Sequence, residues 1–186
     1  MKKILTQNES MFCQAIANVS LMAELFNNDF LHSEYYNCMD WSCGTVNQHN
    51  FQEILSISGL GNPAMLQMFM YSLLVMPKEL LGTDFCKDKF NKEVIKYVTD
   101  YSSTYPNETN KEDVNYYRHI RNAIAHSKCD YSESDGKSYV TFKDNDTRDN
   151  SKYCEIKMQT GDVGRLFEFL MTELMKVLNN TINVDL

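Results

Sequence analysis

Apolar residues recur at three- and four-residue steps in the first part of the chain, from about Ile4 to Phe26. This spacing places them on one face of an α-helix. The stripe consists of Leu5, Phe12, Ala15, Ile16, Val19, Met22 and Phe26. The polar run 27–29 ends the predicted helix, and the pattern assigns no element to 30–41.

A second group of apolar positions predicts the centre of the fold. A short helix is expected from about Val46 to Ile57, followed by a turn at 59–62. Pro63 suits the first position of the next helix, because proline has no N–H to donate there. That helix, from Ala64 to about Met76, is apolar nearly all round and should be buried. Pro77 is expected to stop or kink it.

A further amphipathic helix is predicted from about Asp84 to Tyr101. Its expected inward residues are Phe85, Phe90, Val94, Tyr97 and Val98. Its lysines form a basic run, which is interpreted as a solvated face. They are Lys87, Lys89, Lys92 and Lys96.

The period of the pattern changes in the last third of the chain. After a polar loop, Thr109 and Glu112 have the spacing of a capping box, which predicts a helix reaching about Ser127. Strand-type residues at 139–142 and 153–158 flank a charged segment and predict a β-hairpin. A closing helix is expected from about Asp162 to Leu178.

Together these elements predict an all-α protein, mainly a helical bundle, with one small β-hairpin before the C-terminal helix. The length of 186 residues favours a single domain spanning 1–186. The formal net charge of −7 argues against a generally basic nucleic-acid-binding surface. No export signal or membrane-spanning segment is recognised, so a cytoplasmic location with no membrane partner is expected.

The helix predicted to start at Thr109 carries an unusual polar face. With about 100° per residue, its apolar side chains share one arc of roughly 120°. The other arc carries Asn115, Arg118, His119, Arg121, Asn122 and His126. Acidic residues are absent between Val114 and Cys129. Arginine binds phosphate as a planar fork, and histidine transfers protons near neutral pH. This set can perform phosphate chemistry without a metal or another cofactor.

Metal sites are weaker interpretations of the sequence. The six cysteines are scattered and are expected to be reduced. Cys38, Cys43 and His49 could be imagined as zinc ligands, but their spacing matches no common zinc pattern. No His–carboxylate spacing around 121–126 points to a metal hydrolase.

The run Arg121-Asn122-Ala123-Ile124-Ala125-His126 resembles the R-N-x-x-x-H form of the motif of the HEPN superfamily. The order of elements from about Gly61 to Leu178 is similar to a HEPN subfamily of plasmids and other mobile elements. The resemblance implies a helical domain that forms a two-fold homodimer with a composite cleft between the motif helices. It also implies a metal-independent endoribonuclease in a toxin–antitoxin or phage-defence role, with RNA as substrate and an antitoxin protein as a possible partner.

Carried over residue by residue, the resemblance makes Arg121 and His126 the catalytic pair and Asn122 the polar residue that orients them. Arg118 and His119 lie outside the matched run, and their assignment to substrate binding rests on helix geometry alone. The expected products carry 2′,3′-cyclic phosphate ends. Lys128 stands where adenylylated HEPN toxins have a tyrosine, so that regulation is not expected.

A second hypothesis has the same fold but no catalytic activity. In it the chain is a catalytically inactive HEPN-like module that dimerises, or binds a nucleotide or a protein partner, through the same polar face. The acidic net charge favours this alternative or a restricted RNA substrate. Cleavage of RNA in the presence of a chelator would separate the two hypotheses.

Overall fold

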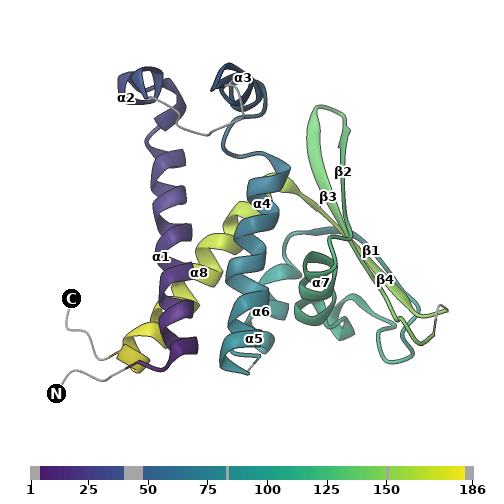
Figure 1. Cartoon of the computed structure of the whole chain (residues 1–186). Helices are drawn as coiled ribbons and strands as arrows, with labels where there is room; N and C mark the ends of the chain where they lie inside the picture. Colours follow the sequence, from purple (N-terminus) through teal and green to yellow (C-terminus); the bar gives the residue numbers. More distant parts are fainter. Residues whose placement is uncertain (1–4, 40–47, 83, 150, 183–186) are drawn as a thin grey trace.

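The computed structural model describes residues 5–39, 48–82, 84–149 and 151–182. The chain is mostly helical, with a small antiparallel sheet packed beside the helices (Figure 1). The helical elements are α1 (Gln7–Asn27), η1 (Phe30–His32), α2 (Glu34–Cys38), α3 (Gln48–Ser58), α4 (Pro63–Met70), η2 (Tyr71–Val75), α5 (Met76–Leu81), α6 (Lys87–Val94), η3 (Lys111–Asp113), α7 (Tyr116–Ala125) and α8 (Thr160–Ile182).

Helix α1 confirms the first predicted helix over its described residues. Its start is fixed by a capping box, in which the Thr6 hydroxyl accepts from the Glu9 N–H and the Glu9 carboxylate accepts from the Thr6 N–H. These two bonds satisfy N–H groups that a helix start otherwise leaves unpaired. Phe12, Ala15, Ile16 and Val19 of the predicted stripe are buried, whereas Phe26 is 56% exposed and its predicted burial is wrong. Ile4 lies outside the described residues.

Helices α4 and α5 form one column with the π-helical turn η2 between them, visible at the centre of Figure 1. The Asn62 side chain caps the start by accepting from the Met65 N–H. The expected stop at Pro77 is wrong, because Pro77 lies buried in the first turn of α5. A π turn moves backbone pairing by one residue, which accommodates a proline that cannot donate.

The column is buried on one side only. Met70, Leu73 and Leu74 have no exposed surface, whereas 62% of Met68 is exposed. The expectation of a helix buried nearly all round is therefore wrong for its outer face. The inner face contacts α1, α7 and α8 and forms the centre of the core.

The helix predicted for 84–101 is shorter than expected. Helix α6 covers only Lys87–Val94, and Val98–Ser103 form strand β1. Residues 98–103 pair antiparallel with β4 (Tyr153–Gln159), and this ladder replaces the helical hydrogen bonds. Phe90 and Val94 are buried as predicted. Tertiary pairing thus overrides the helical pattern in the second half of this segment.

The predicted hairpin is confirmed as β3 (Lys137–Asn145) and β4, but it is half of a larger sheet. Strand β2 (Cys129–Ser134) pairs with β3 through a turn at Asp135 and Gly136, both with positive φ. Such residues suit a tight hairpin turn. The strand order is β1-β4-β3-β2, so the fold is not purely all-α and contains more than one hairpin.

Helix α7 starts later than the sequence predicts. Thr109 does not cap it; Asn115 does, with its side-chain oxygen accepting from the Arg118 N–H at 3.3 Å. Before it the chain forms η3 and a short extended stretch that buries Val114. The capping-box prediction is wrong because Glu108, just before Thr109, is drawn into the interior by bonds to α7.

Helix α7 lies between the α4–α5 column and the sheet (Figure 1). Helix α8 packs along the column and against β3 and β4, and it confirms the predicted closing helix. Its buried residues are Val163, Leu166, Leu170, Leu174 and Leu178. None of the described helices combines the length and the apolar character needed to cross a bilayer.

Candidate functional site

Helix α7 divides its side chains between the core and a polar face. The buried side chains are Tyr116, Tyr117, His119, Ile120, Ala123 and Ile124. Arg118, Arg121 and Asn122 are partly exposed, and His126 at the end of the helix is exposed. The predicted partition of the helix is therefore confirmed for these residues, with His119 as the exception.

His119 is buried, with 1% of its surface exposed. Its Nδ1 lies 2.7 Å from Oδ2 of Asp144, and its Nε2 lies 2.8 Å and 2.9 Å from the two oxygens of Glu108. The expectation that His119 belongs to the exposed polar face is wrong. On the helix it lies only about 40° from Ala123, so the sheet covers it together with the apolar arc.

The two carboxylates around His119 are themselves held in place. Glu108 accepts from the Ser103 hydroxyl at 2.8 Å and from the Asn115 N–H at 3.2 Å. Burial by itself would raise the pKa of Asp144. The hydrogen bond and charge of His119, the amide of Asn122 and the Arg118 guanidinium together outweigh burial and hold this pKa below its usual range.

Asn122 and Arg121 continue this network towards the surface. The Asn122 amide donates to Oδ2 of Asp144 at 3.1 Å, and its oxygen accepts from Arg121 at 3.0 Å. Arg121 also pairs with Asp84 at 3.2 Å. The structure thus brings Arg121 and Asn122 together. The carbonyl of Asn122 accepts from the His126 N–H at 3.0 Å, but among the described residues the imidazole of His126 has no hydrogen bond to either side chain.

His126 lies where α7 ends. The Lys128 N–H donates to the carbonyl of Ala123 at 2.7 Å, and the Ser127 N–H donates to that of Ile124 at 3.1 Å. With Ser127 at φ +53°, these bonds form a Schellman motif. The motif turns the chain sharply and leaves the imidazole of His126 exposed, with no hydrogen bond to another described side chain.

An open hollow of about 570 Å³ lies beside this end of the helix. It is lined by Tyr105, Arg118, Asn122, His126, Lys128, Asp144, Asn145, Asp146, Thr147 and Arg148. The Arg118 guanidinium lies 5.0 Å from the centre of the Tyr105 ring, a cation–π contact that helps to fix its position. Arg121 does not line the hollow, since its guanidinium faces Asp84.

The cations of this hollow differ from many others in the chain. Lys78, Lys89 and Lys143, for example, each pair with a carboxylate. Within the described part of the chain, Arg118, Lys128 and Arg148 form no such ion pair. Together with His126, these three cations can attract an anionic group into the hollow.

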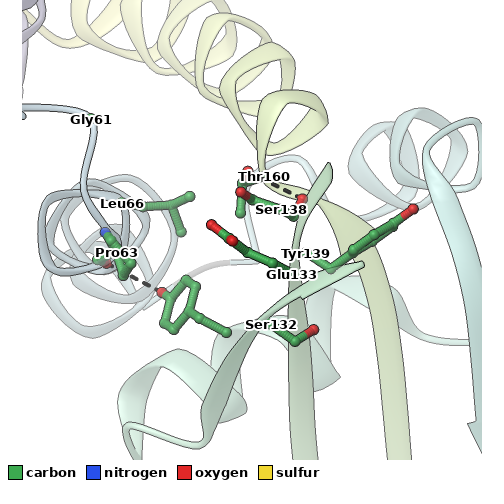
Figure 2. Close-up of a pocket in the computed structure, with 9 residues that line it drawn as sticks. Gly61, Pro63, Leu66, Ser132, Glu133, Ser138, Tyr139 and Thr160 are labelled. Carbon is green, nitrogen blue, oxygen red and sulfur yellow. Dashed lines mark hydrogen bonds between the residues drawn. The ribbon is translucent and has the colours of Figure 1, made fainter. Parts of the chain in front are cut away.

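The hollow between α4 and the β2–β3 hairpin carries less chemistry. Figure 2 shows this hollow of about 400 Å³, with Pro63 and Leu66 opposite Glu133. Tyr131 closes part of it by donating to the Pro63 carbonyl at 3.2 Å. Neither an imidazole nor a guanidinium lines it, so the hollow beside α7 is the stronger functional candidate.

One group of described residues has the donor atoms for a metal ion. Ligand atoms of Glu108, His119 and Cys154 all lie within 4.8 Å of one another. However, Nε2 of His119 faces both Glu108 oxygens at hydrogen-bond distance, which fits an N–H donor. Burial raises the pKa of Cys154 to about 12, which favours the neutral thiol. Of the imagined zinc ligands, Cys43 lies outside the described residues.

Sequence reasoning missed Glu108 and Asp144. Asp144 stands in step with Val140 and Phe142, all pointing to the buried face of β3, and this alternation could have revealed it. Glu108 carries no comparable signal, because it lies in an irregular loop between β1 and η3. The polar site therefore extends deeper than the matched run.

Comparison with known families places the chain in a described family. A family model described as HEPN pEK499 p136 matches residues 1–181, nearly the whole chain. Comparisons with curated proteins and with solved structures gave no match.

Proposed function

Since this chain belongs to the HEPN pEK499 p136 family, we propose that it is a metal-independent endoribonuclease acting at the hollow beside α7. One observation carries the proposal. The exposed imidazole of His126 lies in the same hollow as Arg118, Lys128 and Arg148, which form no ion pair among the described residues, although Asp144 and Asp146 also line it. A proton-transferring group beside three such cations is suited to a phosphodiester substrate.

The proposed reaction uses the nucleophile that RNA itself provides. His126 removes the proton from the 2′-hydroxyl, and the 2′-oxygen attacks the adjacent phosphorus. The bond from phosphorus to the 5′-oxygen breaks, leaving a 2′,3′-cyclic phosphate on one fragment and a 5′-hydroxyl on the other once a proton is returned. Fixed guanidinium groups stabilise the additional negative charge of the transition state.

The two arginines have different surroundings, and we therefore assign them different roles. Arg118 faces the hollow, so we assign it the contact with the phosphate. Arg121 is held by Asp84 and Asn122, so we assign it the positioning of the Asn122 amide. In this assignment the Asn122 side chain contacts a phosphate oxygen and does not hold His126.

We further propose that two copies of the chain form the complete site. A two-fold dimer joining the exposed ends of α7 would bring two His126 rings to one cleft, so that one acts as base and the other as acid. The exposed small side chain of Ala125 permits a close approach of the second copy. A toxin or phage-defence role, with a neutralising antitoxin, is part of the same proposal and would appear as growth arrest on expression.

The test is cleavage of a single-stranded RNA in the presence of EDTA, with a DNA of the same sequence as control. We expect RNA cleavage with cyclic phosphate ends, intact DNA and no effect of EDTA. A single 2′-deoxynucleotide at the cleaved position should protect that bond. Cleavage of the DNA, or loss of activity with EDTA, would contradict the mechanism.

A second candidate is a HEPN-like module that binds a nucleotide or a partner without turnover. The observation that favours it is that the side chains of Arg121 and Asn122 are hydrogen-bonded within the chain. Of the matched polar side chains, that of His126 is left without a hydrogen bond to any described residue. Binding of the same RNA without any cleavage, at all tested protein concentrations, would support this candidate over the nuclease.

A further inference from the structure

The interior beside the hollow contains two buried carboxylates and one buried imidazole. Glu108, His119 and Asp144 each have less than a tenth of their surface exposed. Burying charged groups is unfavourable unless they are paired and hydrogen-bonded. The hydrogen bonds among these three residues show how their charges are compensated.

The contacts define where the protons of His119 lie. Its two ring nitrogens each face a carboxylate, at 2.7 Å for Asp144 and 2.8 Å for the nearer Glu108 oxygen. Glu108 already accepts from Ser103 and from the backbone of Asn115, as an ionised carboxylate does. An imidazolium, with a hydrogen on each ring nitrogen, can donate to both carboxylates in this geometry.

The ring of His119 is linked directly to the candidate site. One oxygen of Asp144, Oδ2, accepts both from His119 and from the Asn122 amide. His119 and Asn122 are three residues apart on α7, so they reach the same carboxylate from adjacent turns. The orientation of Asn122, and through it that of Arg121, thus depends on where His119 holds Asp144.

We infer that His119 is a positioning residue. As a buried imidazolium clamped between Glu108 and Asp144, it fixes the carboxylate that orients Asn122 and Arg121. This inference rests on the proposed nuclease function for its kinetic consequence, whereas the protonation and the positioning can be tested without activity. The competing interpretation is a metal bound by Glu108, His119 and Cys154, in which Nε2 would carry no hydrogen.

The first experiment is nitrogen-15 NMR of the full chain labelled in histidine and asparagine side chains, with His119→Gln for assignment. We expect two protonated ring nitrogens for His119 at neutral pH. We also expect the side-chain amide signal of Asn122 to shift in His119→Gln. The matched control, His32→Gln, changes an exposed histidine that pairs with Asp29 and should leave that amide signal unchanged.

The second experiment compares His119→Gln with the double variant Glu108→Gln/His119→Gln. Removing the imidazolium leaves two buried carboxylates without a cation, so the single variant should melt roughly 10 °C lower than the wild type. Removing one carboxylate as well should recover part of this loss. In RNA cleavage below the melting range, kcat should fall on the order of 10- to 100-fold with KM nearly unchanged.

The outcomes of these two experiments distinguish a positioning imidazolium from a metal ligand and from a purely structural residue. A Nε2 without hydrogen, together with zinc in the purified protein, would overturn the imidazolium in favour of a metal site. An unshifted Asn122 amide, or unchanged kcat in a folded His119→Gln, would reduce His119 to a purely structural role. Failure of the wild type to cleave RNA would refute the nuclease alone, because the NMR and melting results remain decisive for His119.

Discussion

The two histidines of α7 stand seven positions apart and have opposite surroundings. His119 lies in the middle of the helix, covered by β3 and by the loop that carries Glu108, and both its nitrogens are engaged. His126 lies at the helix end, past the cover of the sheet, with its ring open to the hollow. The comparison teaches that one helix can place the same residue type in two environments, which suit two different proposed roles. His119 positions the site, and His126 transfers the proton.

The largest expected difference between them is in activity. His126→Ala should lower RNA cleavage by about 10²- to 10⁴-fold, because the group proposed to move the proton is removed. The free energy of unfolding should change by less than about 0.5 kcal/mol, since the ring is exposed. Initial cleavage rates and urea unfolding of the same preparations measure both. His32→Ala is the matched control and should cleave as the wild type does.

The reverse pattern is expected for His119 in stability. His119→Leu should lower the free energy of unfolding by about 3–5 kcal/mol, because two buried carboxylates lose their cation. Urea unfolding followed by circular dichroism measures this loss. A change below about 1 kcal/mol would mean that the carboxylates become protonated or hydrated at little cost, and the contrast between the two histidines would disappear.

The fold was predictable where local periodicity and tertiary packing agree. Helices α1 and α8 and the β3–β4 hairpin follow their patterns closely. Strand β1 was not predictable, because residues 98–103 are drawn into the sheet by pairing with β4, which lies some fifty residues further on. Thr109 and Glu112 have the spacing of a capping box, but Asn115 caps α7 instead. The bonds of Glu108 to Asn115 and His119 hold the loop before the helix in another conformation.

The candidate site was predictable in part for a similar reason. The run 121–126 marks the correct helix, and the exposure of His126 agrees with its predicted place. The burial of His119 depends on Glu108 and Asp144, which are 11 and 25 residues away in the chain. A helix projection treats the polar arc as one surface and cannot show which part of it another element covers.

A smaller effect should separate the free cations of the hollow from the solvated lysines of α6. If Lys128 contacts a phosphate, Lys128→Gln should weaken RNA binding and reduce the slope of log K against log salt by about 0.7. Lys92→Gln, which removes an exposed lysine on α6, should change neither quantity. Fluorescence anisotropy at several salt concentrations, with cleavage blocked by His126→Ala, provides the measurement.

The smallest expected effect is a pH dependence of stability arising from Asp144. Its pKa is held below the ordinary value by His119, Asn122 and Arg118 against the opposing effect of burial. The folded state therefore takes up this proton less readily than the unfolded chain, whose aspartates titrate near 3.9. The stabilisation is complete above that value and is lost as the pH falls through the folded pKa.

Urea unfolding between neutral and acidic pH tests this expectation. The wild type should lose stability more steeply below about pH 4 than Asp144→Asn, which has no proton to take up at this position. Asp135→Asn, in the exposed β2–β3 turn, should keep the steep dependence of the wild type. Equal slopes for the wild type and Asp144→Asn would contradict the role given to this carboxylate.

The π turn η2 has a consequence for how this chain tolerates insertions and deletions. Its buried residues Leu73, Leu74 and Val75 are consecutive and would spread over about 200° of a regular α-helix. A π turn holds one residue more than a turn of α-helix, so deleting one residue from 71–75 would restore regular winding with α5 near its present orientation. Inserting a further residue would instead rotate α5 by about 100°, turning its packed side away from α1. We therefore expect this turn to tolerate a one-residue deletion better than a one-residue insertion.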